Sequence, residues 1–415
     1  MKNNINQIFE NSTNTKNYLL GLIILSFLLR VLTVYFIRDT NITNEWGVLV
    51  DNLVKYKSYS FYTFEDQLIP SAFMPPLYPF FLYLLKVISP TEGNSFLYLI
   101  FFFQIIFSTF SVYLFYQICK NFFSKKYSLV NSLIFSIIPI NVYACGQISS
   151  VSLQIFLSLL FLKFLLSIIK NQKLKNIIIF SMTSGVLILI RGEFILIFSL
   201  IIFFIFIKKK IKLADLIKIC LITLLIISPY VVRNYIQFDQ IFIVKSLGYN
   251  LWKGNNELAT VDGFETLESP KFKNLKSSLD SLEKNKYYEV NRDNIFLKEA
   301  LNNLKEDSPK YLKLFFKRIF SYYFIDMNSK YPDYYNFLHI FPIIILSVLS
   351  FPGLIVFYKM NKFKNNCIIL YLLSNLIIFS IFFILPRYKM IILPIQLILA
   401  AYFIEYVLKK KFKNE

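Results

Sequence analysis

The chain has 415 residues, of which 56% are hydrophobic and 18% are aromatic, and its mean hydropathy is +0.54. Soluble domains average about 45–50% apolar residues, so this composition excludes an ordinary soluble globule. The formal net charge is +20, but no basic stripe or RNA-binding motif accompanies it, and nucleic acid is not an expected partner. Apolar runs alternate with lysine clusters, which predicts an all-α polytopic membrane protein.

Lysine clusters orient the predicted helices. Short lysine-rich loops face the cytoplasm by the positive-inside rule, and such clusters lie at 120–126, 170–175, 208–210, 359–364 and 409–411. About ten transmembrane helices then fit with both termini inside, the first of them uncleaved because it follows a polar stretch too long for a signal peptide. We expect these helices at 17–37, 95–119, 127–144, 149–169, 176–190, 193–207, 212–229, 337–357, 366–385 and 390–408.

Three segments are then predicted to face outward, into the periplasm if the host is bacterial. They are the first outer loop (38–94), the turn 191–193, and the outer segment (230–336). Apolar stretches at 46–56 and 80–88 are too short to cross, which favours two helices lying in the membrane interface. Helical patterns recur at 291–304 and 310–323. We therefore expect three parts: a transmembrane module at 1–229, a small mixed periplasmic segment at 230–336, and C-terminal transmembrane helices at 337–415.

The arginines carry most of the chemical information. The chain has 38 lysines and only seven arginines, and five arginines lie inside or at the ends of apolar runs on the predicted outer side. An arginine at membrane depth usually marks a functional site, and its planar fork binds phosphate with two hydrogen bonds. These positions point to an enzyme that handles a phosphorylated lipid, with snorkelling anchors at helix ends as the alternative, above all for the first two. The five are Arg30, Arg38, Arg191, Arg233 and Arg387.

Cysteine and histidine offer little chemistry here. The four cysteines lie in apolar runs without metal-ligand spacing, and His339 is the only histidine. Histidine catalysis and zinc ligation are therefore not expected. No cofactor is assigned. Binding of a divalent metal is neither predicted nor excluded, because the sequence contains no cluster of carboxylates that would indicate a metal site.

Several short motifs follow one another in an order seen in a known superfamily. The segments 45–53 (EWGVLVDNL), 58–60 (SYS) and 75–79 (PPLYP) resemble the first outer loop of membrane glycosyltransferases with the GT-C fold, which include protein O-mannosyltransferases and the lipid A aminoarabinose transferase. Four later segments also resemble motifs of that superfamily, so the resemblance covers nearly the whole chain. They are 190–193 (IRGE), 228–235 (SPYVVRNY), 249–256 (YNLWKGNN) and 385–388 (LPRY).

The resemblance implies a reaction and its partners. Such enzymes move a sugar from a polyprenyl-phosphate carrier to an acceptor hydroxyl on the outer face of the membrane. This implies a multi-pass protein of the cell (inner) membrane whose active site faces the periplasm. Its partners would be a lipid-linked sugar, membrane lipid, and a glycan, lipid or protein acceptor. Neither the sugar nor the acceptor can be read from the residues.

The resemblance also suggests site residues. Many relatives place an aspartate where this chain has Thr43, so Glu45 is the expected general base, followed by Asp51 and Asp39; a helix N-terminal acid is the alternative for Glu45. Glu193 either has a catalytic role or forms an ion pair with Arg191 that fixes the turn. The candidates for binding the donor phosphate are Arg191, Arg233, Arg387 and Tyr388, and those for binding substrate are Tyr78, Trp252, Asn255 and Asn256. A structural role is the alternative for all of them, above all for the four substrate-binding candidates.

Two other classes of function compete with an enzyme. A transporter or flippase for a lipid-linked sugar would also need cations at the outer face, but it would usually show internal repeats and interrupted helices, and no repeat is evident. A catalytically inactive scaffold with the same fold is the other alternative, because the family aspartate is missing.

Overall fold

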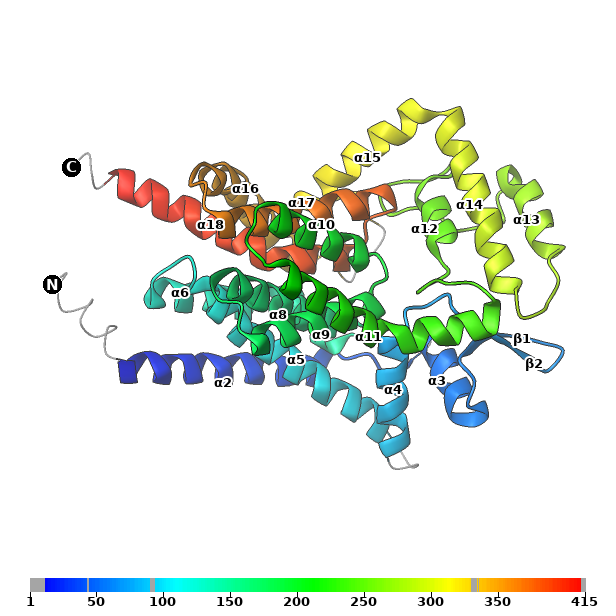
Figure 1. Cartoon of the computed structure of the whole chain (residues 1–415), viewed down its shortest axis with the longest axis horizontal. Helices are drawn as coiled ribbons and strands as arrows, with labels where there is room; N and C mark the ends of the chain where they lie inside the picture. The colour runs from blue at the N-terminus through cyan, green and yellow to red at the C-terminus, as the bar shows by residue number, and fades with distance from the viewer. Residues whose placement is uncertain (1–11, 43–44, 90–93, 330–333, 335, 412–415) are drawn as a thin grey trace.

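A computed structural model of the chain describes residues 12–42, 45–89, 94–329, 334 and 336–411. Helices lie at all ten predicted apolar runs and pack lengthwise into an elongated bundle (Figure 1). Their bounds are α2 (Ser12–Ile37), α5 (Ser95–Cys119), α6 (Lys125–Ile137) followed by α7 (Pro139–Tyr143) and η1 (Ala144–Gly146), α8 (Val151–Lys170), α9 (Leu174–Ile190), α10 (Phe194–Ile207), α11 (Leu213–Phe238), α16 (Phe337–Lys359), α17 (Phe363–Ile381) and α18 (Lys389–Lys411).

The helices differ in their ability to span a membrane. Among the described residues, seven helices are long and apolar enough to cross, and the bent pair α6–α7 makes an eighth. The shorter α9 and α10 have 17 and 14 residues. The all-α polytopic architecture is therefore confirmed, while only part of the predicted ten crossings reach full length as single helices.

A proline breaks the helix that was expected to run unbroken over 127–144. α6 and α7 meet at an angle of 61°, and Pro139 begins the second piece. Proline has no backbone N–H and cannot continue the helical hydrogen bonds. The carbonyl oxygen of Phe135, four residues earlier, instead accepts from Asn141 Nδ2 at 3.1 Å. The carbonyl that loses its backbone donor to Pro139 is therefore paired by a side chain.

The first outer loop contains α3 (Glu45–Tyr56) and α4 (Leu77–Ile88) near the two predicted interfacial helices. Between them lies an antiparallel hairpin, β1 (Ser60–Phe64) and β2 (Gln67–Pro70), which the sequence analysis did not predict. Its turn uses Glu65 and Asp66 with φ of 48° and 63°, although glycine or asparagine is the usual residue there. The hairpin is stabilised from outside, because Tyr62 and Phe64 both pack on Tyr288 of the outer segment.

The outer segment folds around a hydrophobic core of its own. Its centre is Trp252, whose side chain is fully buried against Phe272 and Phe296. The two predicted helical patterns are confirmed as its longest helices. The elements are α12 (Leu247–Gly254), η2 (Pro270–Phe272), α13 (Lys273–Asp280), α14 (Tyr288–Glu306) and α15 (Ser308–Tyr323).

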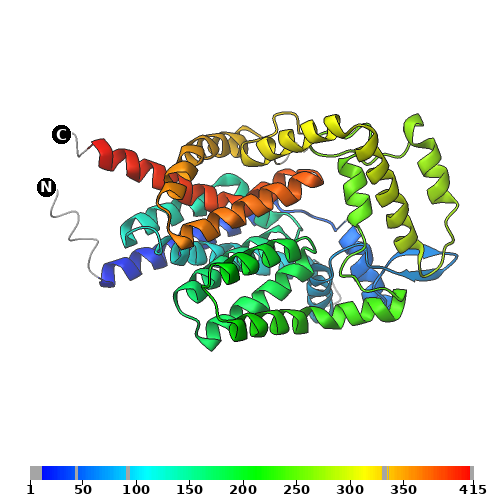
Figure 2. The same ribbon diagram turned by 45° about the horizontal axis from the view of Figure 1, so that its top comes forward.

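The two predicted faces lie at opposite ends of the molecule. The start of α2 and the last turns of α18 lie at one end, and α12, α13, α14 and the hairpin lie at the other (Figure 1). α11 joins these two regions: it passes Pro229 without ending and continues to Phe238, so that its last turns reach the outer segment (Figure 2). The candidate residues of the first outer loop, α11 and the outer segment are thereby brought to one end of the bundle.

Candidate functional site at the outer end of the bundle

Two of the predicted phosphate-binding arginines meet at one tyrosine. Arg191 ends α9, and Arg387 lies in η3 (Pro386–Tyr388) just before α18. The guanidinium carbon of Arg191 is 4.8 Å from the centroid of the Tyr388 ring, and that of Arg387 is 6.0 Å away. Segments almost two hundred residues apart thus present two cations to one buried ring.

The two arginines differ in their remaining partners. Arg191 forms an ion pair with Glu193 at 3.6 Å and donates to Gln154 Oε1 at 3.3 Å. The ion-pair interpretation of Glu193 is therefore confirmed, and the same residues line a small pocket. Arg387 Nε is buried and has no hydrogen-bond partner among the described residues. Arg387 is the more available of the two for an anionic ligand.

Arg233 takes a different position from the other two predicted clamp residues. Its guanidinium donates to the backbone oxygens of Ser71 at 2.7 Å and Tyr59 at 3.2 Å, and to Asn234 Oδ1 at 2.9 Å. These bonds tie the end of α11 to both ends of the hairpin. The geometry favours a role in holding the first outer loop, and phosphate binding by Arg233 stays a prediction.

The two arginines nearest the N-terminus have separate environments. Arg30 is fully buried, so it does not snorkel. It joins three helices, because Nε donates to Ser108 Oγ at 2.6 Å and Nη1 donates to Ser26 Oγ at 2.6 Å and to the Ser136 oxygen at 3.2 Å. Arg38 lies over the ring of Tyr98 at 4.7 Å and is partly exposed, which fits an anchor at the helix end.

The three candidate carboxylates lie at different places in the first outer loop. Glu45 is exposed at the start of α3, and Asp51 is exposed further along the same helix. The position of the missing aspartate, Thr43, lies outside the described residues. Burial mainly raises the pKa of Tyr62 and of Tyr249, and the Glu45 carboxylate also raises both. The charge of Glu45 is therefore a minor influence on one tyrosine of the hairpin and one of α12.

Asp39 is engaged with the bundle. Its Oδ2 accepts from the backbone N–H of Ile148 at 2.7 Å. Burial raises the pKa of Tyr78, and the charge of Asp39 adds to that effect. The Tyr78 ring packs edge-on against Trp46 at 5.0 Å, and its buried hydroxyl has no hydrogen-bond partner among the described residues. Tyr78 thus joins α4 to Trp46 of α3, within the influence of the Asp39 charge.

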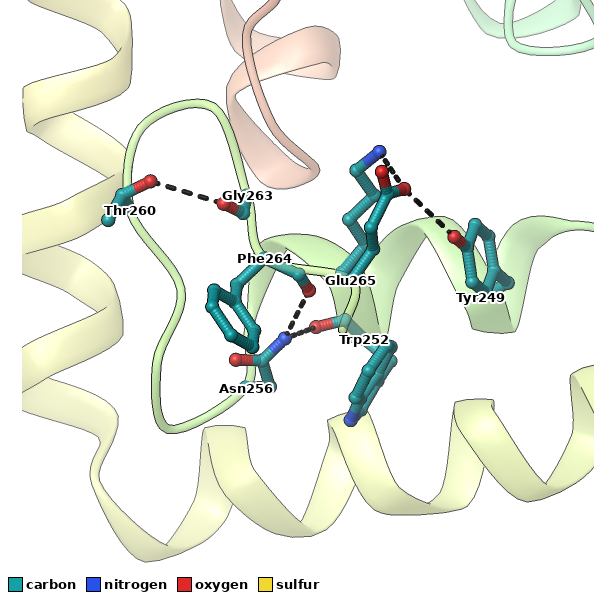
Figure 3. Close-up of polar contacts among 8 residues, drawn as sticks. Tyr249, Trp252, Asn256, Thr260, Gly263, Phe264 and Glu265 are labelled. Atoms are coloured by element: carbon teal, nitrogen blue, oxygen red, sulfur yellow. Dashed lines mark hydrogen bonds and ion pairs between the residues drawn. The ribbon is translucent and has the colours of Figure 1, made fainter. Parts of the chain in front are cut away.

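Three predicted substrate-binding residues, Trp252 of α12 and Asn255 and Asn256 just after it, are held inside the protein. Asn255 Nδ2 donates to the Leu251 and Ile381 oxygens, both at 2.9 Å. Asn256 Nδ2 donates to the Trp252 oxygen at 3.1 Å and the Phe264 oxygen at 2.7 Å (Figure 3). With Trp252 fully buried, these contacts favour scaffolding, and direct substrate contact stays a prediction for all three.

A polar group on the other side of α12 is more exposed. Glu265 accepts from the Tyr249 hydroxyl at 3.0 Å and pairs with Lys253 (Figure 3). Burial of Glu265 opposes ionisation, but the hydrogen bond from Lys253 and its positive charge, with the Tyr249 bond, lower the pKa of its carboxyl overall. This ionised group faces the same side as the Tyr249 ring.

Sequence analysis missed two buried charged residues that connect the parts. Glu289, 3% exposed, accepts from Ser71 Oγ at 2.7 Å and from the backbone N–H groups of Ala72 at 2.7 Å and Phe73 at 3.0 Å. Burial raises the pKa of the Glu289 carboxyl, against these hydrogen bonds. A charged residue in an amphipathic helix usually faces water, so the pattern alone did not single it out.

The second missed residue is Arg318 of α15, which is fully buried. It donates to the Thr260 oxygen at 3.0 Å, to Asn255 Oδ1 at 3.3 Å and to the Gly254 oxygen. Burial lowers its pKa to about 9. The only signal in the sequence is its position seven residues after Tyr311 on the buried face of α15. Across the described residues, no three His, Cys, Asp or Glu side chains converge in a way that could hold a metal ion.

Comparison with known proteins agrees with this architecture. Residues 74–232 match the family described as dolichyl-phosphate-mannose-protein mannosyltransferase. None of the curated protein sequences matches the chain. Among solved structures, the apo oligosaccharyltransferase of Archaeoglobus fulgidus is 14% identical with a TM-score of 0.58, and covers 97% of this chain and 51% of its own.

Two further structures of that enzyme are equally similar. One is tethered to an acceptor peptide containing the NVT sequon, with 15% identity and a TM-score of 0.57, over 97% of this chain and 50% of the other. The other, named AglB, is in complex with an inhibitory peptide and a dolichol-phosphate. It has 14% identity and a TM-score of 0.57, and the match covers 95% of this chain and 51% of the AglB chain. This chain spans about half the length of these proteins, and the likeness shows a shared fold. The resemblance to membrane glycosyltransferases of the GT-C fold is confirmed.

Proposed function

We propose that this chain is a membrane glycosyltransferase with the GT-C fold, and that it moves a sugar from a polyprenyl-phosphate carrier to an acceptor hydroxyl on the outer face of the cell membrane. The description of the matched family names a lipid-phosphate sugar donor. One solved structure with this fold holds a dolichol-phosphate. Both support a lipid-linked donor for this chain. The lysine distribution supports an active site facing the outside, the periplasm in a bacterial inner membrane.

The observation that carries the proposal is the meeting of Arg191 and Arg387 at the Tyr388 ring. When the glycosidic bond breaks, negative charge develops on the departing lipid phosphate. Fixed cations in a site shielded from water stabilise that charge more strongly than they would in bulk solvent. Arg387, whose buried Nε has no partner among the described residues, can supply such a hydrogen bond to a phosphate oxygen.

The first outer loop supplies the other half of the reaction. The acceptor oxygen attacks the anomeric carbon, its proton passes to a carboxylate, and the bond from that carbon to the phosphate oxygen breaks. Glu45 is the strongest candidate for this carboxylate, because it is exposed at the start of α3 and is the acid nearest the position of the missing aspartate. Asp39 is less accessible, since its Oδ2 accepts from Ile148. Asp51 is exposed but lies further along α3.

Reconstituted protein tests this function directly. Proteoliposomes would receive polyprenyl-phosphate mannose and host envelope extract as acceptor source, and released polyprenyl phosphate would be measured. We expect turnover by the wild type and a loss of about 10²–10⁴-fold in Glu45→Gln, the usual cost of removing a general base. Asp51→Asn and Asp39→Asn are the matched comparisons.

The outcomes separate the alternatives. If Glu45→Gln remains active while Asp51→Asn or Asp39→Asn is inactive, the loop is correct and the base is misassigned. Transport of intact donor without release of polyprenyl phosphate would support a transporter. A folded wild type without turnover of mannose or any other host lipid-linked sugar would support an inactive scaffold.

A further inference from the structure

We propose that Arg292 and the rings around it form a subsite for an acidic sugar, so that the acceptor is a glycan or glycolipid bearing carboxylate or phosphate groups. This inference rests on the proposed transferase function, since it assigns the acceptor of that reaction. The residues that form this Arg292 subsite are Tyr62 of β1, Phe73 after β2, Tyr249 of α12 and Arg292 of α14.

Aromatic rings from three elements hold the guanidinium of Arg292. Its central carbon is 5.1 Å from the ring centroid of Phe296, 5.4 Å from that of Tyr249 and 5.9 Å from that of Tyr62. Such contacts attract the cation through the ring faces but do not use its N–H donors in conventional hydrogen bonds. The rings therefore fix the position of Arg292 and leave its fork available.

No carboxylate or carbonyl in the described part of the chain accepts a hydrogen bond from Arg292 within normal distance. The neighbouring acids on α14 are already occupied: Glu289 accepts from residues 71–73, and Asp293 Oδ1 accepts from the Tyr249 N–H at 2.9 Å. By contrast, Arg30, Arg191, Arg233 and Arg318 each bind protein oxygens. Arg292 is a partly exposed cation with its charge held in place and its donors uncommitted.

The surroundings of Arg292 suit a sugar. Phe73 packs against Tyr249 with ring centroids 5.5 Å apart, so aromatic surface continues from α12 to the segment after the hairpin. Aromatic faces bind the apolar faces of sugar rings, and a guanidinium fork binds carboxylate or phosphate through two hydrogen bonds. Tyr62 and Phe73 belong to the first outer loop, which also carries Glu45. A sugar bound here through its acidic group would therefore lie against the loop that carries the proposed base.

Binding measurements on the full-length protein in nanodiscs test the subsite. Calorimetry would compare oligogalacturonate, a phosphorylated oligosaccharide such as mannopentaose phosphate, and neutral cello-oligosaccharide of similar length. We expect the wild type to bind at least one acidic probe about tenfold more tightly than the neutral one, the size of effect that one charge-assisted hydrogen bond provides. The two acidic probes distinguish a carboxylate-bearing from a phosphate-bearing acceptor.

Variants show whether Arg292 causes the preference. Arg292→Gln should abolish it, and Arg292→Lys should weaken it, since charge remains but the fork is lost. Lys298→Gln is the matched control, because it removes an exposed cation from the same helix and should change nothing. Equal binding of acidic and neutral probes, or a preference unchanged in a folded Arg292→Gln, would overturn the proposal.

A second measurement separates this inference from the proposed function. Release of polyprenyl phosphate to water, without acceptor, should be the same in wild type and Arg292→Gln, whereas the KM for the preferred acidic acceptor should rise about tenfold or more in the variant. Donor turnover without any Arg292-dependent effect on acceptor KM would contradict the Arg292 subsite but remain consistent with the proposed transferase function. Binding of acidic probes that depends on Arg292, without donor turnover, would support the subsite and contradict the proposed transferase function.

Discussion

At the scale of single residues, the arginines divide by what accepts their hydrogen bonds. Arg30 and Arg318 are fully buried and bind protein oxygens at several sites. Burying a charge is costly unless hydrogen bonds replace the lost water. The hydrogen bonds of Arg30 and Arg318 therefore indicate a structural role inside the protein. Arg30 Nη2 and Arg318 Nε also lack partners in the described part of the chain, but both side chains are enclosed by protein, whereas Arg387 and Arg292 are partly exposed and have unpaired donors among the described residues. This division separates arginines that hold the fold from those available to a ligand.

The first prediction concerns Arg387. Arg387→Lys keeps the positive charge but loses the planar fork, so we expect folded protein with most transferase activity lost. Release of polyprenyl phosphate and thermal unfolding would be measured together. The control is Lys208→Arg on an exposed inner loop, which should not affect activity. A turnover rate equal to the wild type would mean that Arg387 only anchors its helix end.

A glycine supports the second prediction. A Cβ on Gly254 would lie 1.9 Å from the backbone oxygen of Phe382, whereas a Cβ on Gly21 of α2 would meet nothing within 4 Å. We therefore expect Gly254→Ala to destabilise the protein by about 1–3 kcal/mol or more, the usual cost of overpacking. Gly21→Ala should be neutral or slightly stabilising, because alanine favours helix. Thermal unfolding in detergent measures both, and equal stability of the two variants would contradict the close approach of α12 to residue 382.

At the scale of elements, the first outer loop is held from two sides. Arg233 of α11 binds the Ser71 and Tyr59 oxygens, and Glu289 of α14 binds the Ser71 hydroxyl and the N–H groups of residues 72 and 73. Arginine donates and glutamate accepts, so both kinds of backbone group at the end of the hairpin are satisfied. The same segment leads directly into α4, and its position therefore depends on the outer segment.

The third prediction tests this connection. In Glu289→Gln, the amide oxygen can still accept from the N–H groups of residues 72 and 73 while the NH₂ group faces the Ser71 hydroxyl, but a neutral acceptor replaces a carboxylate, and the weaker hydrogen bonds cost about 1–3 kcal/mol. We expect faster hydrogen exchange at residues 72 and 73 and lower thermal stability. Glu283→Gln removes an exposed carboxylate from the same segment and should leave exchange at those residues unchanged. Unaltered protection in Glu289→Gln would show that Arg233 suffices to hold the loop.

At the scale of the whole molecule, the outer segment and the bundle are held together by a shared helix, by helix packing and by hydrogen bonds. α11 runs from one into the other (Figure 2), and α15 reaches back to contact α17. Lys389, at the start of α18, donates to the Tyr322 and Phe324 oxygens at 3.1 and 2.7 Å, where α15 ends. A cation at the C-terminus of a helix pairs with its unsatisfied carbonyls and dipole. The candidate site therefore lies between parts that are fixed to one another.

The fourth prediction is the orientation in the membrane. In a Cys220→Ser background, an impermeant maleimide applied to intact cells or spheroplasts should label Asp280→Cys in α13 but not Lys208→Cys after α10, whereas opened membranes should show both. Both positions are exposed, and the remaining native cysteines are buried. Labelling of Lys208→Cys from outside would invert the predicted topology and move the candidate site to the inner face.

The sequence by itself determined the helices and their alternation between two faces, because length, apolar composition and lysine position act locally on each run. It also singled out Arg191, Arg387 and Tyr388 as candidates, since short motifs of residue types can be read along the chain. The tertiary structure alone decided which of these meet, why Asn255 and Asn256 point into the protein, and that Arg233 and Glu289 hold the same loop. Ser71 and Glu289 are separated by 218 residues. A contact over such a distance depends on how the elements pack, and no local pattern encodes it.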